Sequence, residues 1–196
     1  LTLWREMELQ RPILHRAEVF GRADPDITLS EGSSRATRAT RGGDGVVYRF
    51  AVSNAVMRAG LHYAQFTTTV GDSAHFGVAH WLRGSRCTLE LSQCDCFYAT
   101  SSGQRVVAAF SADRALHSNG ERHEWEGMQS AQPGDRIGLL LDLDQRTMAV
   151  YKNDERLGVM MGPSGLSGAY CWAARLIRRD SSVRIEPAPL PAGAQQ

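Results

Sequence analysis

Tryptophan and arginine side chains stand at two places where this chain of 196 residues is expected to turn. One group lies just before Gly84, and the other follows an apolar run that ends at Leu176. Tryptophan and arginine are frequent anchors of protein–protein contacts because they combine a large contact area with directed hydrogen bonds. A tryptophan lid on the core and an ordinary charged hairpin remain the alternatives. The candidate partner-binding residues of these two groups are Trp81, Leu82, Arg83, Ile177, Arg178 and Arg179.

Residues with catalytic potential are sparse. Asp142 and Asp144 form a carboxylate pair, but they lie between two expected strands, where such side chains usually hydrogen-bond to the turn. The sequence contains no G-x-S-x-G, P-loop or H-E-x-x-H motif. The glycine-rich residues 42–45 are not followed by a helix that could hold a phosphate at its N-terminus. We therefore expect no enzyme activity and no cofactor.

The sequence also contains residue types that bind metal ions or sugars. Three cysteines (Cys87, Cys94, Cys96) and two histidines (His117, His123) lie close together, but their spacing lacks the two paired motifs of a structural zinc site. We expect no metal and, because no secretory signal is visible, a cytoplasmic, reducing location with Cys171 as a buried thiol. A loop carrying His117, Asn119 and Arg122 near Trp125 loosely resembles the sugar site of a galectin, a weaker alternative.

Charge and hydropathy exclude two further classes of partner. Lys and Arg number 22 against 21 Asp and Glu, so the net charge of +1 gives no strong basic field for nucleic acid. Arg35, Arg38 and Arg41 recur every three residues and are expected on a solvated loop, with an acidic-peptide or phosphate contact as the alternative. No apolar run reaches the ~20 residues that cross a bilayer, so membrane insertion is not expected.

The elements that must position these residues are short strands. Between residues 134 and 186, short apolar runs alternate with polar turns at the spacing typical of a sandwich or barrel. Met148 and Val150 share one face of their run, so one side of that strand is expected on a core and the other near water. Asn153 and Asp154 tolerate positive φ and predict a hairpin. The expected strands are 136–142, 147–152, 156–160, 170–176 and 182–186, preceded by 46–52.

Several motifs occur in the order typical of the SPRY domain, the core of the B30.2 family. Toward the C-terminus they are residues 134–142 (GDRIGLLLD), 151–154 (YKND), 157–158 (LG), 170–174 (YCWAA) and 182–185 (SVRI). Upstream, residues 57–66 and 72–78 resemble the family's G-x-H-Y and F-G-V strands. Residues 125–127, ahead of a Gly-Asp strand, are similar to SPRY domains of protist type. The chain therefore resembles a SPRY domain over residues 26–186.

This resemblance implies an all-β fold, a two-sheet antiparallel β-sandwich of the concanavalin-like jelly-roll kind, with its ligand surface on loops at one end. In the family, the loop that corresponds to Arg178 and Arg179 helps to form that surface, and Arg22 and Asp24 fall where the N-terminal binding loop would lie. Trp125 and Trp172 are expected in the core. Residues 1–25 are expected to be a strap or linker, and residues 187–196 an extended tail.

The expected function is non-enzymatic recognition of a peptide or folded protein partner by a monomeric domain of a longer chain or complex. That expectation rests on the resemblance, because a fold alone does not fix a function. The alternatives are a structural subunit of a larger assembly and, more weakly, a lectin-like domain.

Overall fold

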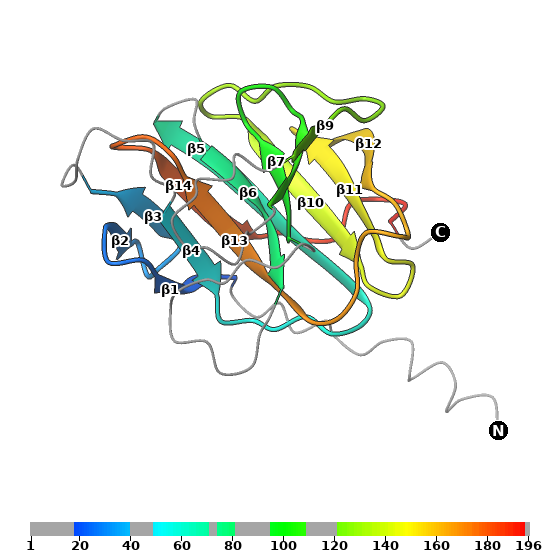
Figure 1. Ribbon diagram of the computed structural model, residues 1–196, viewed down its shortest axis with the longest axis horizontal. Coiled ribbons are helices and arrows are strands. Elements are labelled where there is room, and N and C mark those ends of the chain that lie inside the picture. Colours follow the sequence, from blue (N-terminus) through cyan, green and yellow to red (C-terminus); the bar gives the residue numbers. More distant parts are fainter. Residues whose placement is uncertain (1–17, 40–48, 71–73, 81–94, 109–120, 195–196) are drawn as a thin grey trace.

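The computed structural model describes residues 18–39, 49–70, 74–80, 95–108 and 121–194, and these residues form two antiparallel sheets of seven strands each. The first sheet has the order β1 (Phe20–Ala23), β4 (Arg49–Ser53), β13 (Tyr170–Leu176), β6 (Ala74–His80), β7 (Asp95–Ala99), β8 (Arg105–Ala108) and β9 (Glu121–His123). The second has the order β12 (Glu155–Met161), β11 (Thr147–Lys152), β10 (Arg136–Asp142), β5 (Leu61–Val70), β14 (Ser182–Pro187), β3 (Arg35–Arg38) and β2 (Ile27–Ser30). Figure 1 shows the two layers lying face to face.

The predicted fold class is confirmed, and so are the strands of the C-terminal half. Strands β10, β11 and β13 have the expected bounds, β14 extends one residue further, and β12 extends one residue at each end. The strand expected over 46–52 appears as β4, and its first three residues lie outside the described part of the chain. Local alternation and turn chemistry are enough to predict these strands because both act over a few residues.

The hairpin between β11 and β12 turns at two residues with left-handed backbone. Asn153 has φ of 51° and Asp154 has φ of 73°, as the sequence predicted. The carboxylate of Asp142, at the preceding hairpin, accepts hydrogen bonds from the backbone N–H of Asp144 (2.9 Å) and of Gln145 (2.8 Å). The expected turn hydrogen bonding is therefore confirmed for Asp142, while the Asp144 carboxylate accepts from the backbone N–H of Gly60 at 3.0 Å.

The main core lies between the two sheets. Trp172 on β13 is fully buried, and its ring centroid lies 5.9 Å from that of Phe66 on β5 in an edge-to-face contact. Phe66 in turn stacks on Phe76 of β6 at 4.9 Å. Trp125 is half-buried against the same core, and its indole Nε1 donates to the carbonyl of Gly103 at 2.7 Å. Both tryptophans therefore contribute to the core, as expected.

Both sheets are also covered on parts of their outer faces. On the first sheet, the outward positions of β13 and its neighbours form a second buried cluster that includes Cys171, the expected buried thiol. On the second sheet, Ala149 and Tyr151 of β11 are 7% and 5% exposed. The expectation that this side of β11 faces water is therefore wrong, because Leu190 and Ala194 of the C-terminal segment pack over it.

Candidate functional site

Asp24 and residues 177–179 lie at one end of the sandwich. Leu176, the last residue of β13, pairs with Arg49, the first residue of β4, and the next residue, Phe50, donates its N–H to the Asp24 carboxylate at 2.8 Å. The β13–β14 connection lies at the left edge of Figure 1, on the side of β2 and β3. We call this region the arginine end and define it by Asp24, Asp26, Arg38, Arg49 and residues 177–181.

The β13–β14 loop at the arginine end is held from the second sheet by Arg38. The guanidinium of Arg38 donates to the carbonyl of Ile177, and its backbone N–H donates to the carbonyl of Ser181 at 3.0 Å. The N–H of Asp180 donates to the carbonyl of Arg38 at 3.2 Å, and Asp180 has φ of 62°. These contacts fix the loop backbone, while Arg178 and Arg179 at its tip are exposed.

Charge at the arginine end is partly compensated. Arg49 forms an ion pair with Asp26 at 2.6 Å, and both side chains are about one-third exposed. Burial lowers the pKa of Arg38, and the charges of Arg49 and Arg179 act in the same direction, while the charge of Asp26 opposes the shift. The arginine end thus combines four arginines with the carboxylates of Asp24, Asp26 and Asp180, and the exposed guanidinium groups at its loop tip are of the kind that binds acidic ligands.

The sequence predicted that Arg35, Arg38 and Arg41 lie on a solvated loop. For Arg35 and Arg38 this prediction is wrong. Arg35 and Arg38 belong to β3, and Arg35 pairs with Glu31 at 2.7 Å. Arg38 is 8% exposed because it lies beneath the β13–β14 loop. Arg41 lies outside the described residues.

The two predicted residues near the N-terminus, Asp24 and Arg22, have different roles. Burial raises the pKa of Asp24, while the hydrogen bond from Phe50 and the charge of Arg49 oppose that shift. The Asp24 carboxylate therefore holds the β1–β2 turn against β4 by this hydrogen bond. Arg22 is half-buried in β1 opposite Val52, a member of the outer cluster of the first sheet.

Trp81, Leu82 and Arg83 lie outside the described residues, so their role stays a prediction. His80, which precedes them, pairs with Tyr170 at the opposite end of β13 from Leu176. Of the cysteines and histidines considered as metal ligands, Cys87, Cys94 and His117 also lie outside the described residues. Within the described residues, no three His, Cys, Asp or Glu side chains group to hold a metal ion. No described helix has the length and apolar character needed to cross a membrane.

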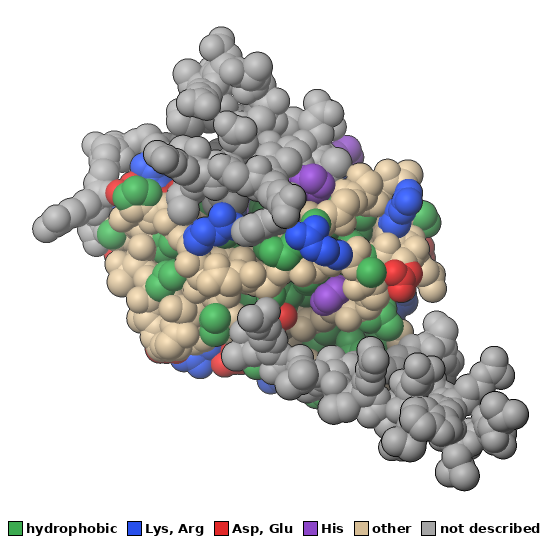
Figure 2. All heavy atoms as spheres, turned by 90° about the horizontal axis from the view of Figure 1, so that it is seen from below, with side chains coloured by type: hydrophobic (Ala, Val, Ile, Leu, Met, Phe, Trp, Pro, Cys, Tyr) green, Lys and Arg blue, Asp and Glu red, His purple; other side chains and the backbone are tan. Residues whose placement is uncertain are grey.

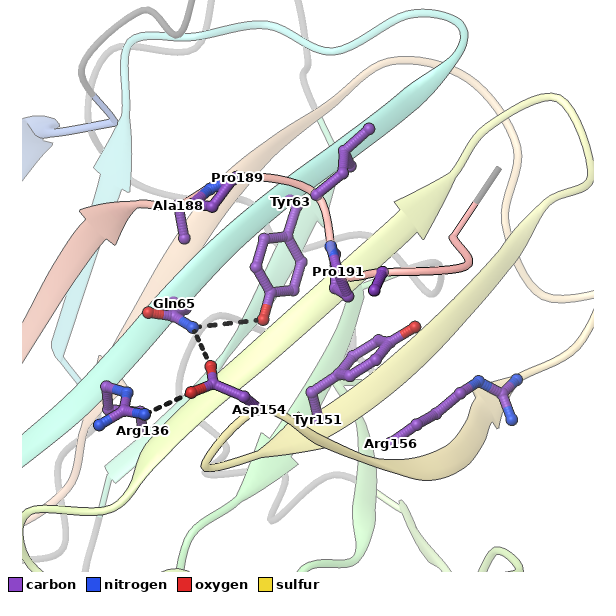
Figure 3. Close-up of a pocket in the computed structure, with 11 residues that line it drawn as sticks. Tyr63, Gln65, Arg136, Tyr151, Asp154, Arg156, Ala188, Pro189 and Pro191 are labelled. Carbon is purple, nitrogen blue, oxygen red and sulfur yellow. Dashed lines mark hydrogen bonds and ion pairs between the residues drawn. The ribbon is translucent and has the colours of Figure 1, made fainter. Parts of the chain in front are cut away.

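A groove on the outer face of the second sheet was not anticipated from the sequence. It has a volume of about 690 Å³ and lies between the C-terminal segment 188–192 and side chains of four strands, with the β11–β12 hairpin at its edge. Tyr63 and Tyr151 meet edge to face in it, with ring centroids 5.9 Å apart (Figure 3). The signal that could have revealed it is the alternation of Tyr63 and Tyr151 onto outer faces together with prolines at 187, 189 and 191.

The rim of this groove is polar. Asp154 forms an ion pair with Arg136 at 2.5 Å and accepts a hydrogen bond from Gln65 Nε2 at 3.0 Å (Figure 3). Arg156 lines the groove from β12 and is exposed. Burial raises the pKa of the Tyr63 hydroxyl, which therefore stays protonated at neutral pH. The groove thus offers an aromatic floor with a charged edge.

A buried histidine is set beside a buried arginine on the outer face of the first sheet. His75 of β6 pairs with Arg175 of β13, and the two are 2% and 1% exposed. Burial lowers the pKa of His75 from 6.5 to about 3, and the charges of Arg175 and Arg122 contribute in the same direction. The imidazole of His75 is therefore neutral in the folded protein at neutral pH.

Because His75 is buried in its neutral form, we expect the free energy of unfolding to fall in acid. The unfolded chain binds a proton at His75 below pH 6.5, while the folded chain does so only near pH 3, so stability falls as pH drops through that window, by at most about 1.4 kcal/mol per pH unit. Urea unfolding at a series of pH values should show a shallower fall for His75→Gln. His62→Gln, at a half-exposed position, is the control, and equal pH dependence of all three proteins would contradict the prediction.

Among the described residues on one face of the molecule, basic side chains do not form a single continuous patch. Figure 2 shows Lys and Arg side chains interspersed with hydrophobic and uncharged ones over the described part of one face. The arginine end and the outer groove are two described places where side chains suited to binding a ligand lie together.

Comparisons with known proteins identify the fold. No protein-family model matches the sequence, and no curated protein matches it. Among solved structures, the SPRY domain of human HERC1 is 16% identical, with a TM-score of 0.62 over 86% of this chain and 99% of that one. The TRIM65 PSpry domain is 15% identical, with a TM-score of 0.59 over 94% and 96%, and a human SPRY domain is 16% identical, with 0.55 over 84% and 98%. The chain has the SPRY fold, and the resemblance seen in its motifs is confirmed at that level.

Proposed function

We propose that this chain is a protein-recognition domain without catalytic activity, and that it binds an acidic peptide or surface at the arginine end. SPRY domains are typically protein-interaction modules, and this supports the general class of function. The observation that carries the proposal is the β13–β14 loop, whose tip exposes Arg178 and Arg179 while Arg38 holds its backbone.

Physical chemistry favours this loop as the contact surface. A guanidinium can donate two parallel hydrogen bonds to one carboxylate, and the bond is stronger because both groups are charged. A loop already fixed from both sheets loses little further entropy when a partner binds. Arg178 and Arg179 are thus presented at a fixed place, and the partner needs carboxylates or phosphates that match them.

A charge-reversal experiment tests the proposal. Arg178→Glu with Arg179→Glu should reduce capture of partners from native extract at least tenfold, which corresponds to about 1.4 kcal/mol. Arg58→Glu is the matched control because Arg58 is exposed beside Met57, which bridges Tyr170 at the opposite end of β13. Capture is measured by quantitative mass spectrometry on equal amounts of folded bait.

The result that would refute the proposal is equal capture by the wild-type chain and both variants. Equal loss in both variants would also refute it, because a general charge effect and not the arginine end would then govern binding. The melting temperature of each bait, compared with that of the wild type, shows that the substitutions leave the fold intact.

A further inference from the structure

The C-terminal segment crosses the outer face of the second sheet and occupies part of the outer groove. β14 ends at Pro187, which pairs with Ala64 of β5, and the chain then continues across the sheet toward β11 (Figure 1). Leu190 and Ala194 pack against a cluster made by Leu140, Ala149 and Tyr151. Ala188, Pro189 and Pro191 lie along the Tyr63 side of the groove (Figure 3). The segment thus covers apolar side chains that would otherwise face solvent.

The segment is held by side chains and not as an added strand. Residues 188–194 are outside every strand, and their backbone is engaged in a turn in which the N–H of Ala194 donates to the carbonyl of Pro191 at 3.1 Å. Proline fixes φ of residues 189 and 191, and it also drives the preceding residues toward extended backbone. A prearranged, extended proline-rich segment on an aromatic floor is a known mode of peptide recognition.

The rest of this outer face has a different character. Toward β3 and β14 it carries ion pairs, with Arg184 contacting Glu31 and Glu186, and Arg35 contacting Glu31. On the described part of this face, the apolar and aromatic cluster lies beneath Leu190. The segment fills the groove only in part, because open volume remains next to Arg156 and Asp154. Alanines at 188 and 192 are small occupants of a site that has room for larger side chains.

We propose that the outer groove is a binding site for proline-rich segments with a leucine between prolines, and that residues 188–194 occupy it in cis. A tethered segment acts at an effective concentration of about millimolar, so a partner segment of similar affinity cannot displace it from the intact chain. Release of the C-terminal segment opens the groove to such a partner. This site lies on β5, β10, β11 and β12, away from the arginine end, and is independent of the function proposed above.

The test uses the full chain and a fluorescent peptide with its own sequence, Pro-Ala-Pro-Leu-Pro-Ala-Gly. Leu190→Asp places a charge on the apolar cluster and should release the segment in cis. Fluorescence anisotropy should then show at least tenfold tighter peptide binding than to the wild-type chain. Adding Ala149→Arg, which places a long charged side chain in the apolar cluster that Leu190 packs against, should abolish that gain. A peptide with aspartate in place of leucine should not bind either chain.

A second variant keeps the test decisive if Leu190→Asp does not fold. Pro189→Gly with Pro191→Gly leaves Leu190 in place but removes the fixed backbone, so peptide binding should tighten by a few fold. Unchanged binding in every folded variant would overturn the proposal. So would equal binding of the leucine and aspartate peptides, or light scattering that shows the released segment pairing two copies of the chain without peptide binding. Arg178→Glu with Arg179→Glu should leave peptide binding unchanged.

Discussion

Replacing Trp172 with alanine is expected to lower the free energy of unfolding by about 3–5 kcal/mol. Trp172 is fully buried at the centre of β13, where it meets the ring of Phe66 edge to face at 5.9 Å. Phe66 stacks on Phe76, so the indole supports an aromatic column that joins the two sheets. The loss combines the transfer free energy of the indole with the cost of the cavity it leaves. The strands on both sides cannot close that cavity, because hydrogen bonds to their neighbours hold them in place. Urea unfolding followed by fluorescence or circular dichroism measures the loss.

Trp172→Phe is the matched variant and should lose much less, about 1–2 kcal/mol. Within the described residues, the indole Nε1 of Trp172 is buried without a hydrogen-bond partner, so phenylalanine removes no hydrogen bond. Trp125→Phe differs because the indole of Trp125 donates to the carbonyl of Gly103 at 2.7 Å. If Trp172→Ala proved no more destabilising than Trp172→Phe, the aromatic column would not hold the sheets together.

Gly127→Ala is expected to cost about 2–5 kcal/mol, the sum of backbone strain and overpacking. Gly127 has φ of +89°, and a Cβ there would lie 2.1 Å from the carbonyl oxygen of Leu157 on β12. The three nearest atoms are all backbone atoms of Leu157, so no flexible side chain could move aside. The turn that carries Trp125 would have to move away from β12, and Trp125 would lose its packing contacts with the core.

Gly134→Ala isolates the steric part of this effect. Gly134 has φ of +90°, nearly the same as Gly127, but a Cβ there meets nothing within 4 Å. It should therefore cost only the strain of a left-handed alanine, about 1–2 kcal/mol. Unfolding midpoints of the two variants, compared under the same conditions, give the difference. Equal destabilisation would mean that the turn at Gly127 does not press against β12 in solution.

Much of the fold could be predicted from the sequence because strands and turns depend on patterns among neighbouring residues. The bounds of β10, β11 and β13 follow from period-two alternation and from turn residues beside them. Asn153 and Asp154 predicted the β11–β12 hairpin because their side chains tolerate left-handed backbone, and the observed φ values of 51° and 73° confirm this. The order of motifs predicted the SPRY fold, which the solved structures share at 15–16% identity.

The candidate sites could be predicted less well because they depend on which strands become neighbours. Arg22 and Asp24 are two residues apart in the sequence, yet the β1–β4 ladder places Arg22 opposite Val52 and turns Asp24 toward Phe50. Arg38 was expected in solvent, but strand order puts it under the β13–β14 loop. No local pattern contains this information, since the contacting residues are far apart along the chain.

By itself, the sequence determined strands β10 to β14, the turn at Asn153 and Asp154, and the alternation of side chains between the two faces of these strands, since these depend on neighbouring residues. Only the tertiary structure decided what covers each apolar side. Alternation puts Tyr151 on the outer side of β11, but only the folded chain brings Leu190 onto it and forms the outer groove. The physical reason is that burial is gained by contacts between distant residues, and these contacts exist only once the sheets are assembled.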